Sequence, residues 1–160
     1  MARLVSTDLD RIDKAILREL QRDGRIANVE LSRRVGLSAT PCLERVKRLE
    51  KNGYIKGYSA KVAPEKLDAA LLVFVEIRLT RTSPDVFDDF KKSVIDLPQV
   101  LECHLVSGDF DYLVKARVAD MAAYRNLLGE TLLTLPGVSG SRTYVVMEEV
   151  KESSEIQILG

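Results

Sequence analysis

The sequence repeats one short motif, Leu-Pro-x-Val, first at residues 97–100 and again 38 residues later at residues 135–138. Before each copy the apolar residues recur at helical spacing, and after each copy a strand-like segment begins. Alternation of apolar and polar residues at 73–79, with further strand-like segments at 100–106 and 112–118, completes the order β-α-β-β-α-β. That order is typical of the ferredoxin-like split unit, so we predict an α+β fold for the last hundred residues.

One face of this predicted sheet has no helix to cover it, because a split unit places both helices on the same side. Phe74 and Tyr144 are expected on that open face. A second copy of the chain is the simplest cover for such a face, so we expect a homodimer with two-fold symmetry.

The first sixty residues show helical periodicity from their start. A first helix is predicted from an apolar stripe, which consists of Leu9, Ile12, Ile16 and Leu20. Asp8 and Asp10 at its start suit the helix dipole, and Gly24 is expected to end it in the left-handed conformation. Asn28 is expected to cap a second helix, which Gly36 ends.

Residues 28–51 indicate a helix-turn-helix. After the Gly36 turn, Ser38 is expected to cap a third helix with Pro41 in its first turn and a basic outer face. In this arrangement the later helix enters the major groove, where its first residues reach base edges and its basic residues bind phosphates. The residues expected to face DNA are Asn28, Ser38, Ala39, Thr40, Pro41, Cys42, Glu44, Arg45, Lys47, Arg48 and Lys51.

A β-hairpin, the wing, is predicted to follow at residues 54–62, with Lys56 and Lys61 available to phosphates. The alternative is a three-helix domain whose basic face is only solvated. The glycine turn, the capped basic helix and the following wing together favour DNA binding.

Charge divides the chain in the same place. Residues 1–57 carry 13 Lys and Arg against 8 Asp and Glu, whereas residues 58–160 carry 11 against 16. Charge therefore suggests two modules with different partners, and we predict a DNA-binding domain with its wing and linker at 1–62 and a second domain at 63–160.

The turn at residues 108–111, Gly-Asp-Phe-Asp, offers groups for both ends of an α-amino acid. Its backbone N–H groups are placed to receive a carboxylate, and Asp109 or Asp111 is placed to hold an ammonium group. The alternative is a hairpin loop whose aspartates bond only to their own backbone, which the local sequence alone favours.

Several other classes of protein are disfavoured. The longest apolar stretch, residues 69–75, is far shorter than the roughly 18 residues of a membrane helix, and no secretory signal begins the chain. Cys42 and Cys103 lie far apart and His104 is the single histidine, so no metal site is expected. We expect a cytoplasmic protein with reduced thiols and no cofactor, in which Cys42 is a packed residue; a redox switch is the alternative.

Several strings of the sequence resemble the Lrp/AsnC (feast/famine) family of transcription regulators. They lie at residues 8–13, 28–32, 35–38, 41–46, 53–55, 104–113 and 133–138. The likeness runs from about residue 8 to residue 150 and includes both predicted domains.

The resemblance implies a winged helix-turn-helix followed by an amino-acid-metabolism regulation domain, in a nucleoid-associated activator or repressor of transcription. It also implies homodimers that assemble into octamers or larger rings on double-stranded DNA. Leucine or a similar apolar amino acid is the implied effector, bound between dimers beside the turn at 108–111. The positions implied for this site are Leu105, Gly108, Asp109, Asp111, Met121, Tyr144, Val145 and Val146.

Two rival functions stay open at this point. Some chains with this two-domain plan resemble haem-precursor decarboxylases, which need a cluster of catalytic His, Arg or Tyr side chains. His104, alone on a predicted strand, is more typical of a structural histidine, so we predict no enzyme. The other rival is a sensor that acts through protein contact alone, which a failure to bind DNA would indicate.

Overall fold

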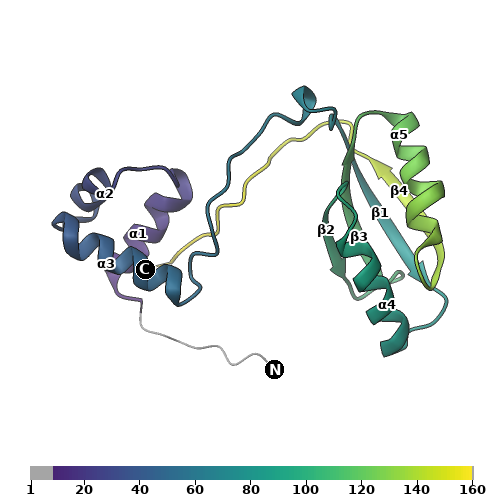
Figure 1. Ribbon diagram of the computed structural model, residues 1–160, viewed down its shortest axis with the longest axis horizontal. Coiled ribbons are helices and arrows are strands. Elements are labelled where there is room, and N and C mark those ends of the chain that lie inside the picture. The colour runs from purple at the N-terminus through teal and green to yellow at the C-terminus, as the bar shows by residue number, and fades with distance from the viewer. Residues whose placement is uncertain (1–8, 160) are drawn as a thin grey trace. The chain divides into compact units, whose positions relative to one another are not determined.

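In the computed structural model, which describes residues 9–159, the chain forms two units (Figure 1). The first unit takes the chain up to Lys61 together with the C-terminal tail from Lys151, and the second unit is Val62–Val150. The tail therefore groups with the first unit by its contacts, whereas the sequence pattern assigned it to the second domain. The reason is that the tail makes hydrogen bonds to the first helix, which no local pattern in the tail indicates.

The first helix, α1, spans Arg11–Arg22 and begins at an Asp10 cap. The Asp10 carboxylate accepts from the Asp13 N–H at 2.8 Å, and the Asp13 carboxylate accepts from the Asp10 N–H at 3.4 Å. The two residues thus form a reciprocal capping box, which satisfies backbone groups that a helix start leaves open.

The apolar stripe of α1 is confirmed, but the predicted end of the helix is not. Four residues of the stripe pack in the core of the unit: Leu9, Ile12, Ile16 and Leu20. The helix ends at Asp23 in an extended conformation, and Gly24 is not left-handed. A Cβ at Gly24 would lie 3.1 Å from the Tyr58 ring, so close packing explains the glycine. Asp8 lies outside the described residues.

The second helix, α2, spans Asn28–Val35, and the third, α3, spans Ala39–Lys51. Gly36 between them is left-handed, with a φ of 73°, as predicted. The predicted caps differ in detail. Ala27 occupies the N-cap position of α2, and Ser38 occupies that of α3 without a side-chain hydrogen bond.

The predicted wing hairpin is wrong, because residues 54–62 contain no strand. Tyr54 packs against the helical core, and its N–H donates to the Leu49 carbonyl at 2.9 Å. The Tyr58 hydroxyl donates to Glu50 at 2.9 Å. The segment therefore closes the C-terminal end of α3 and does not fold back on itself.

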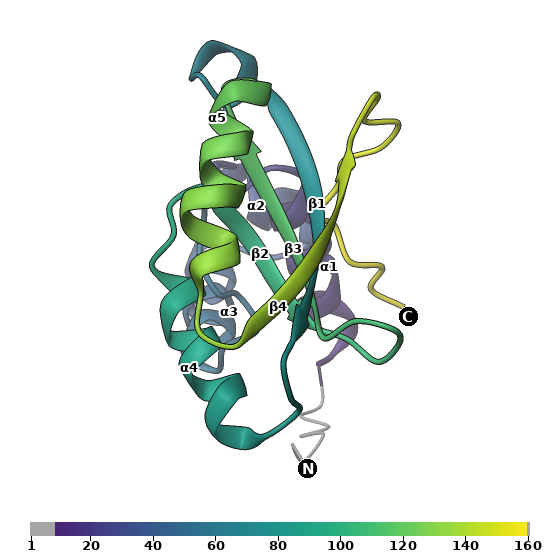
Figure 2. The same cartoon turned by 90° about the vertical axis from the view of Figure 1, so that its right-hand side faces the viewer.

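The second unit has the predicted order β-α-β-β-α-β. Its main elements are β1 Leu71–Leu79, α4 Pro84–Ile95, β2 Val100–Leu105, β3 Tyr112–Val118, α5 Met121–Asn126 and β4 Val138–Val145. Three short helical segments complete it: η1 Pro64–Lys66, η2 Leu127–Thr131 and η3 Leu132–Thr134. The strands pair antiparallel in the order β2-β3-β1-β4, and α4 and α5 lie on one face of the sheet (Figure 2).

The core of this unit lies between the sheet and its helices. Phe90 of α4 and Leu132 of η3 are fully buried in one cluster with Val75 and Ile77 of β1. Burial of each such side chain stabilises the fold by about 1.5–3 kcal/mol. The unit thus has a complete hydrophobic core of its own.

The second copy of the repeated motif contains Gly137, where the first copy has Gln99. Gly137 is left-handed, with a φ of 77°, and its carbonyl accepts from the Thr80 N–H at 2.7 Å. A Cβ at this position would lie 2.4 Å from the Val86 Cγ1 atom. Both the backbone conformation and the contact therefore require glycine here.

The opposite face of the sheet is not covered by either α4 or α5. Tyr144 of β4 pairs with Phe74 of β1 across the strands, and its hydroxyl donates to Glu76 at 2.8 Å. The register therefore agrees with the expectation that Phe74 and Tyr144 share the open face.

Candidate nucleic-acid interface and effector site

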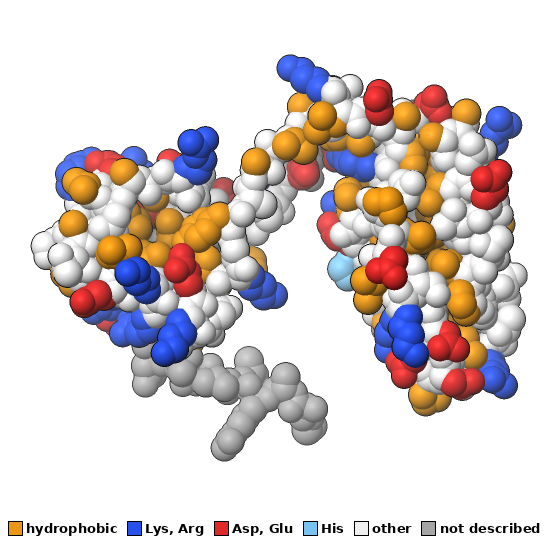
Figure 3. Space-filling model, in the orientation of Figure 1, with side chains coloured by type: hydrophobic (Ala, Val, Ile, Leu, Met, Phe, Trp, Pro, Cys, Tyr) orange, Lys and Arg blue, Asp and Glu red, His pale blue; other side chains and the backbone are white. Residues whose placement is uncertain are grey.

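The first turn of α3 presents small side chains to solvent. Ser38, Ala39 and Thr40 are exposed, and Pro41 is half-buried. These are the positions from which a recognition helix reaches base edges. Lys and Arg side chains are spread around the first unit in Figure 3. The predicted DNA-facing residues that are exposed further along α3 are Glu44, Lys47, Arg48 and Lys51.

Cys42 does not belong to this surface, which corrects the prediction that it faces DNA. Its side chain is fully buried in a core with Ile16, Leu31 and Leu49. The next residue along α3, Leu43, is 42% exposed, so Cys42 and not Leu43 faces the core. Burial raises the pKa of the Cys42 thiol, which is the opposite of what a redox-active cysteine requires.

Arg45 and Arg48, predicted to hold phosphates, form ion pairs inside the unit. Arg48 Nη2 donates to both Asp13 carboxylate oxygens at 2.7 Å, and Arg45 Nη1 donates to Asp13 Oδ1 at 2.9 Å. Arg45 also pairs with Asp10 at 2.5 Å. The Asp13 N–H, followed by the Arg45 guanidinium, holds the pKa of Asp10 below its usual value.

This cluster fixes α3 against α1. The Asp13 side chain is only 2% exposed, so its charge depends on the two arginines for compensation. The Arg45 side chain is 26% exposed and the Arg48 side chain 52% exposed. Arg45 therefore acts mainly to position the recognition helix, whereas Arg48 also faces solvent.

Asn28 links the starts of the two helices. Its Nδ2 donates to the Ala39 carbonyl at 2.8 Å, and its buried Oδ1 has no hydrogen-bond partner among residues 9–159. The side chain thus holds the first turn of α3 in place from within the unit.

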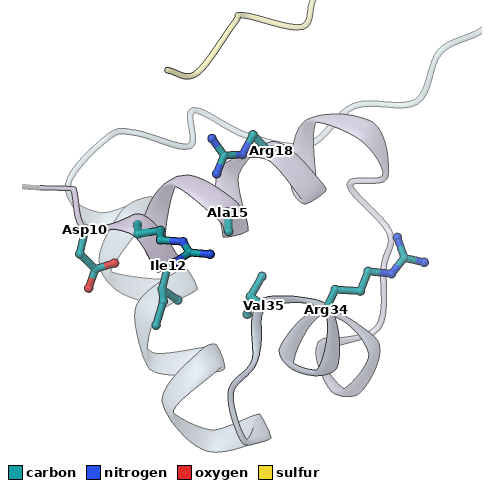
Figure 4. Close-up of a pocket in the computed structure, with 7 residues that line it drawn as sticks. Asp10, Ile12, Ala15, Arg18, Arg34 and Val35 are labelled. Atoms are coloured by element: carbon teal, nitrogen blue, oxygen red, sulfur yellow. The ribbon is translucent and has the colours of Figure 1, made fainter. Parts of the chain in front are cut away.

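A hollow of 540 Å³ lies beside α1 and α2 (Figure 4). Ile12, Ala15 and Val35 supply its apolar lining, and Arg18 and Arg34 are among its polar residues. None of the predicted DNA-facing residues lines it. The hollow is therefore distinct from the recognition surface.

In the second unit, Asp111 is bound to β1 twice. Its N–H donates to the Ile77 carbonyl at 3.0 Å, and its Oδ2 accepts from the Leu79 N–H at 2.7 Å. One carboxylate oxygen of Asp111 thus accepts a backbone hydrogen bond, but the donor belongs to β1 and not to the turn. Gly108 and Asp109 are exposed.

The predicted effector positions form two groups within one chain. The turn group lies at the turn between β2 and β3: Leu105, Gly108, Asp109 and Asp111. The strand-end group lies toward the other end of the sheet: Met121, Tyr144, Val145 and Val146. Through β1, Tyr144 lies level with Lys115 and Val145 with Ala116, a distance of about 10–14 Å along β3 from its start at Tyr112.

Both groups contain exposed apolar side chains. The exposed fractions are 56% for Leu105, 49% for Met121, 46% for Tyr144 and 42% for Val145. Such side chains, when they gather on a surface, mark sites of interaction. A hollow of 460 Å³ in this unit, lined by Gln99, Arg117 and Asn126 among others, includes none of the eight predicted positions.

His104 lines neither of the two hollows described above. It is exposed, with Nε2 3.1 Å from Glu102 Oε2, and the other Glu102 oxygen accepts from Lys115 at 2.9 Å. Within residues 9–159 no group of three His, Cys, Asp or Glu side chains is placed to hold a metal ion. In the same residues no helix has the length and apolar character needed to cross a membrane.

Each of the two units matches a known protein family. Residues 9–56 match the family described as winged helix-turn-helix DNA-binding, and residues 72–156 match the Lrp/AsnC ligand binding domain. The chain belongs to the Lrp/AsnC family. The predicted family and fold class are thereby confirmed, although the chain itself forms no hairpin at residues 54–62.

Relatives in the Lrp/AsnC family match almost the whole chain. The leucine-responsive regulatory proteins of Klebsiella pneumoniae and Escherichia coli K12 are each 68% identical over 151 residues, which is 94% of this chain and 92% of each relative.

Solved structures of the family agree. A transcriptional regulator from Neisseria meningitidis, in complex with L-methionine, has a TM-score of 0.89 at 39% identity and covers 94% of this chain and 97% of its own. The feast or famine regulatory protein of Mycobacterium tuberculosis, also complexed with L-methionine, has a TM-score of 0.85 at 33% identity. It covers 93% of this chain and 99% of its own.

An Lrp/AsnC protein with a helix-turn-helix is a DNA-binding transcription regulator, and this chain is one. The prediction of a regulator is confirmed at that level. The family is one of transcription regulators.

Sequence reasoning missed two residues of the first unit, Asp13 and Gln21. The spacing of Asp10 and Asp13 at the start of an apolar helix is that of a reciprocal cap, so a signal was present. Gln21 binds Ile156, 135 residues away, and nothing in the local sequence indicates that contact.

Proposed function

We propose that an aliphatic amino acid, leucine or a similar one, controls the assembly of this regulator and its occupancy of double-stranded DNA. The observation that carries the proposal is the division of the effector positions into two groups with exposed apolar side chains, which lie apart along the sheet. A site that uses both groups takes one from each of two copies. The leucine-responsive relatives, and the two similar regulators solved with L-methionine, support an amino acid as the ligand.

The two groups supply different chemistry. In the turn group, backbone N–H groups beside Gly108 suit a carboxylate, and Asp109 or Asp111 suits an ammonium group. In the strand-end group, Met121 and Val145 suit an aliphatic side chain. Burying a side chain the size of leucine contributes about 1.5–3 kcal/mol, enough to distinguish aliphatic from small polar amino acids.

On the DNA side, the exposed residues Ser38, Ala39 and Thr40 are proposed to contact base edges. Lys47 and Lys51, both exposed on α3, are proposed to bind phosphates. A two-fold dimer presents two such helices, which suits a palindromic operator.

Assembly connects the two activities. The open sheet face around Phe74 is proposed to be buried in a homodimer, and dimers are proposed to assemble into octamers or larger rings through the effector groups. An effector bound between dimers changes assembly only if it binds the assembly states with unequal affinity. Because several DNA-binding units then engage together, a modest shift in assembly produces a large shift in occupancy.

Complementation between two variants tests the shared site. Leu105→Ser alters the turn group and Val145→Ser alters the strand-end group, and each alone should abolish the response to leucine. When the two variants are reassembled together at equal amounts, about one site in four combines an intact turn group with an intact strand-end group. The leucine response, measured by sedimentation velocity and by operator binding, should then return in part.

Leu133→Ser is the matched control, because Leu133 is 42% exposed but lies outside both groups. It should respond as the wild-type protein does. Failure of the mixture to recover any response contradicts a site shared between copies. Unchanged sedimentation and DNA binding of the wild-type protein at millimolar concentrations of every standard amino acid contradicts the proposed function itself.

A further inference from the structure

The C-terminal tail binds α1 through its backbone. The Gln21 amide donates from Nε2 to the Ile156 carbonyl at 2.9 Å, and its Oε1 accepts from the Ile156 N–H at 2.7 Å. One side chain thus satisfies both backbone groups of one tail residue, as a neighbouring strand does in a sheet.

A second contact continues the same pattern. Arg18 Nη1 donates to the Ile158 carbonyl at 3.1 Å. Arg18 and Gln21 are three residues apart and share one face of α1, and the carbonyls of Ile158 and Ile156 accept from them. The helix therefore presents two matched side chains to one edge of the tail.

The apolar side chains of the tail are at most half-buried, as that of Ile158 is. Ile156 is 75% exposed and Leu159 is 71% exposed. Hydrogen bonds that remain near water contribute little net stability each. The docked tail is consequently a reversible contact and not part of the core of the unit.

The other end of the tail is fixed in the second unit. Arg117 Nη2 donates to both Glu149 oxygens at 2.6 and 2.7 Å, and the Arg117 side chain is only 10% exposed. Ile156 follows Glu149 by seven positions along the chain, a reach of at most about 25 Å. The same chain continues from β4, which carries Tyr144 and Val145 of the strand-end group.

We propose that residues 150–159 form a strap that couples the effector domain to the DNA-binding unit by docking on Arg18 and Gln21. The inference rests on the proposed function, since it requires an effector beside the end of β4. An effector that shifts this end changes the position from which the strap starts, and so changes its docking. By reciprocity, a docked strap alters the affinity for the effector by the same factor.

The test compares Gln21→Ala with Gln157→Ala in the full-length protein. Gln21→Ala removes both bonds to Ile156 and keeps a residue of high helix propensity. Gln157 is exposed on the strap beside the docked residue, so its variant is the matched control. The Ile156 amide should be protected from hydrogen exchange in the wild type and in Gln157→Ala, and unprotected in Gln21→Ala.

Operator affinity is then measured with and without leucine. We expect the fold-change caused by leucine to fall by about threefold or more in Gln21→Ala, and to remain unchanged in Gln157→Ala. Ile156→Pro removes the backbone N–H of the strap that donates to Gln21, so it should reproduce the Gln21→Ala result.

The outcomes separate the two proposals. A wild-type protein whose Ile156 amide exchanges freely overturns the docking. Equal leucine responses in the wild type and in Gln21→Ala overturn the coupling while the proposed function stands. A wild-type protein that ignores every amino acid overturns the proposed function, and the coupling with it.

Discussion

The DNA surface and the effector positions differ in how much of the site one chain supplies. The DNA-facing residues predicted on the two helices of the helix-turn-helix lie within residues 28–51, and the contacts of Asp13 fix α3 from inside the same unit. The effector positions extend over residues 105–146 and form two exposed groups. The recognition helix is therefore positioned by its own helical unit alone, whereas the proposed effector site depends on assembly.

Replacing Asp13 by Ala tests the first half of this comparison and should have the largest effect. The variant loses the carboxylate shared by Arg45 and Arg48 and one half of the capping box. Because the side chain is buried and charge-paired, we expect the free energy of unfolding of the first unit to fall by about 3 kcal/mol. Urea denaturation measures this change, and operator affinity should fall with it.

Glu44→Ala is the control for Asp13→Ala, because Glu44 is exposed on the same recognition helix. Its effect on unfolding should stay within about 0.5 kcal/mol. A loss of less than about 1 kcal/mol in Asp13→Ala would show that α3 is positioned by other contacts.

Gly137→Ala tests how much the close packing at this glycine stabilises the second unit. A Cβ there combines a left-handed backbone with a 2.4 Å approach to Val86, so we expect a loss of about 2 kcal/mol in unfolding free energy. Gly129→Ala is the matched control, since no atom lies within 4 Å of its Cβ position. Calorimetry should show a lower melting temperature for the first variant only; equal melting temperatures contradict the packing argument.

Asp111→Asn sharpens the second half of the comparison. Asparagine keeps an oxygen that accepts from the Leu79 N–H but removes the negative charge. If that charge holds the ammonium group, leucine affinity falls about tenfold, or about 1.4 kcal/mol, with operator affinity nearly intact. Isothermal titration measures the affinity, and Asp96→Asn, exposed at the end of α4, is the control. Undiminished leucine affinity in Asp111→Asn removes this residue from the ammonium site.

Local periodicity was sufficient to predict the elements that bury a continuous apolar face. The stripe of α1 and the alternation of β1 gave the three-helix unit and the split β-α-β-β-α-β unit, because each pattern fits only one regular structure. Gly36 was predicted correctly for the same kind of reason, since a left-handed residue ends the helix there.

Local sequence patterns did not predict the contacts between distant parts of the chain. Cys42 and Leu43 are adjacent and both apolar, so spacing alone did not decide which one faces the core. The predicted wing failed because Tyr54 packs on the helices, which a strand-like pattern does not reveal. The division of the effector positions follows from the register of β1 with β3 and β4, which only the folded sheet supplies.

Lys47→Ala has the smallest expected effect and returns to the comparison from the DNA side. Lys47 is exposed on α3, so its loss should weaken binding to all sequences a few-fold and lower the dependence of log affinity on log salt by about 1 per helix engaged. Lys91→Ala on α4 is the control and should leave that slope unchanged. Operator binding measured over a range of salt concentrations gives the slope. In a dimer that engages both recognition helices, the slope of log affinity against log salt should fall by about 2. The size of the change therefore gives the number of helices bound. An unchanged slope would show that Lys47 does not contact DNA.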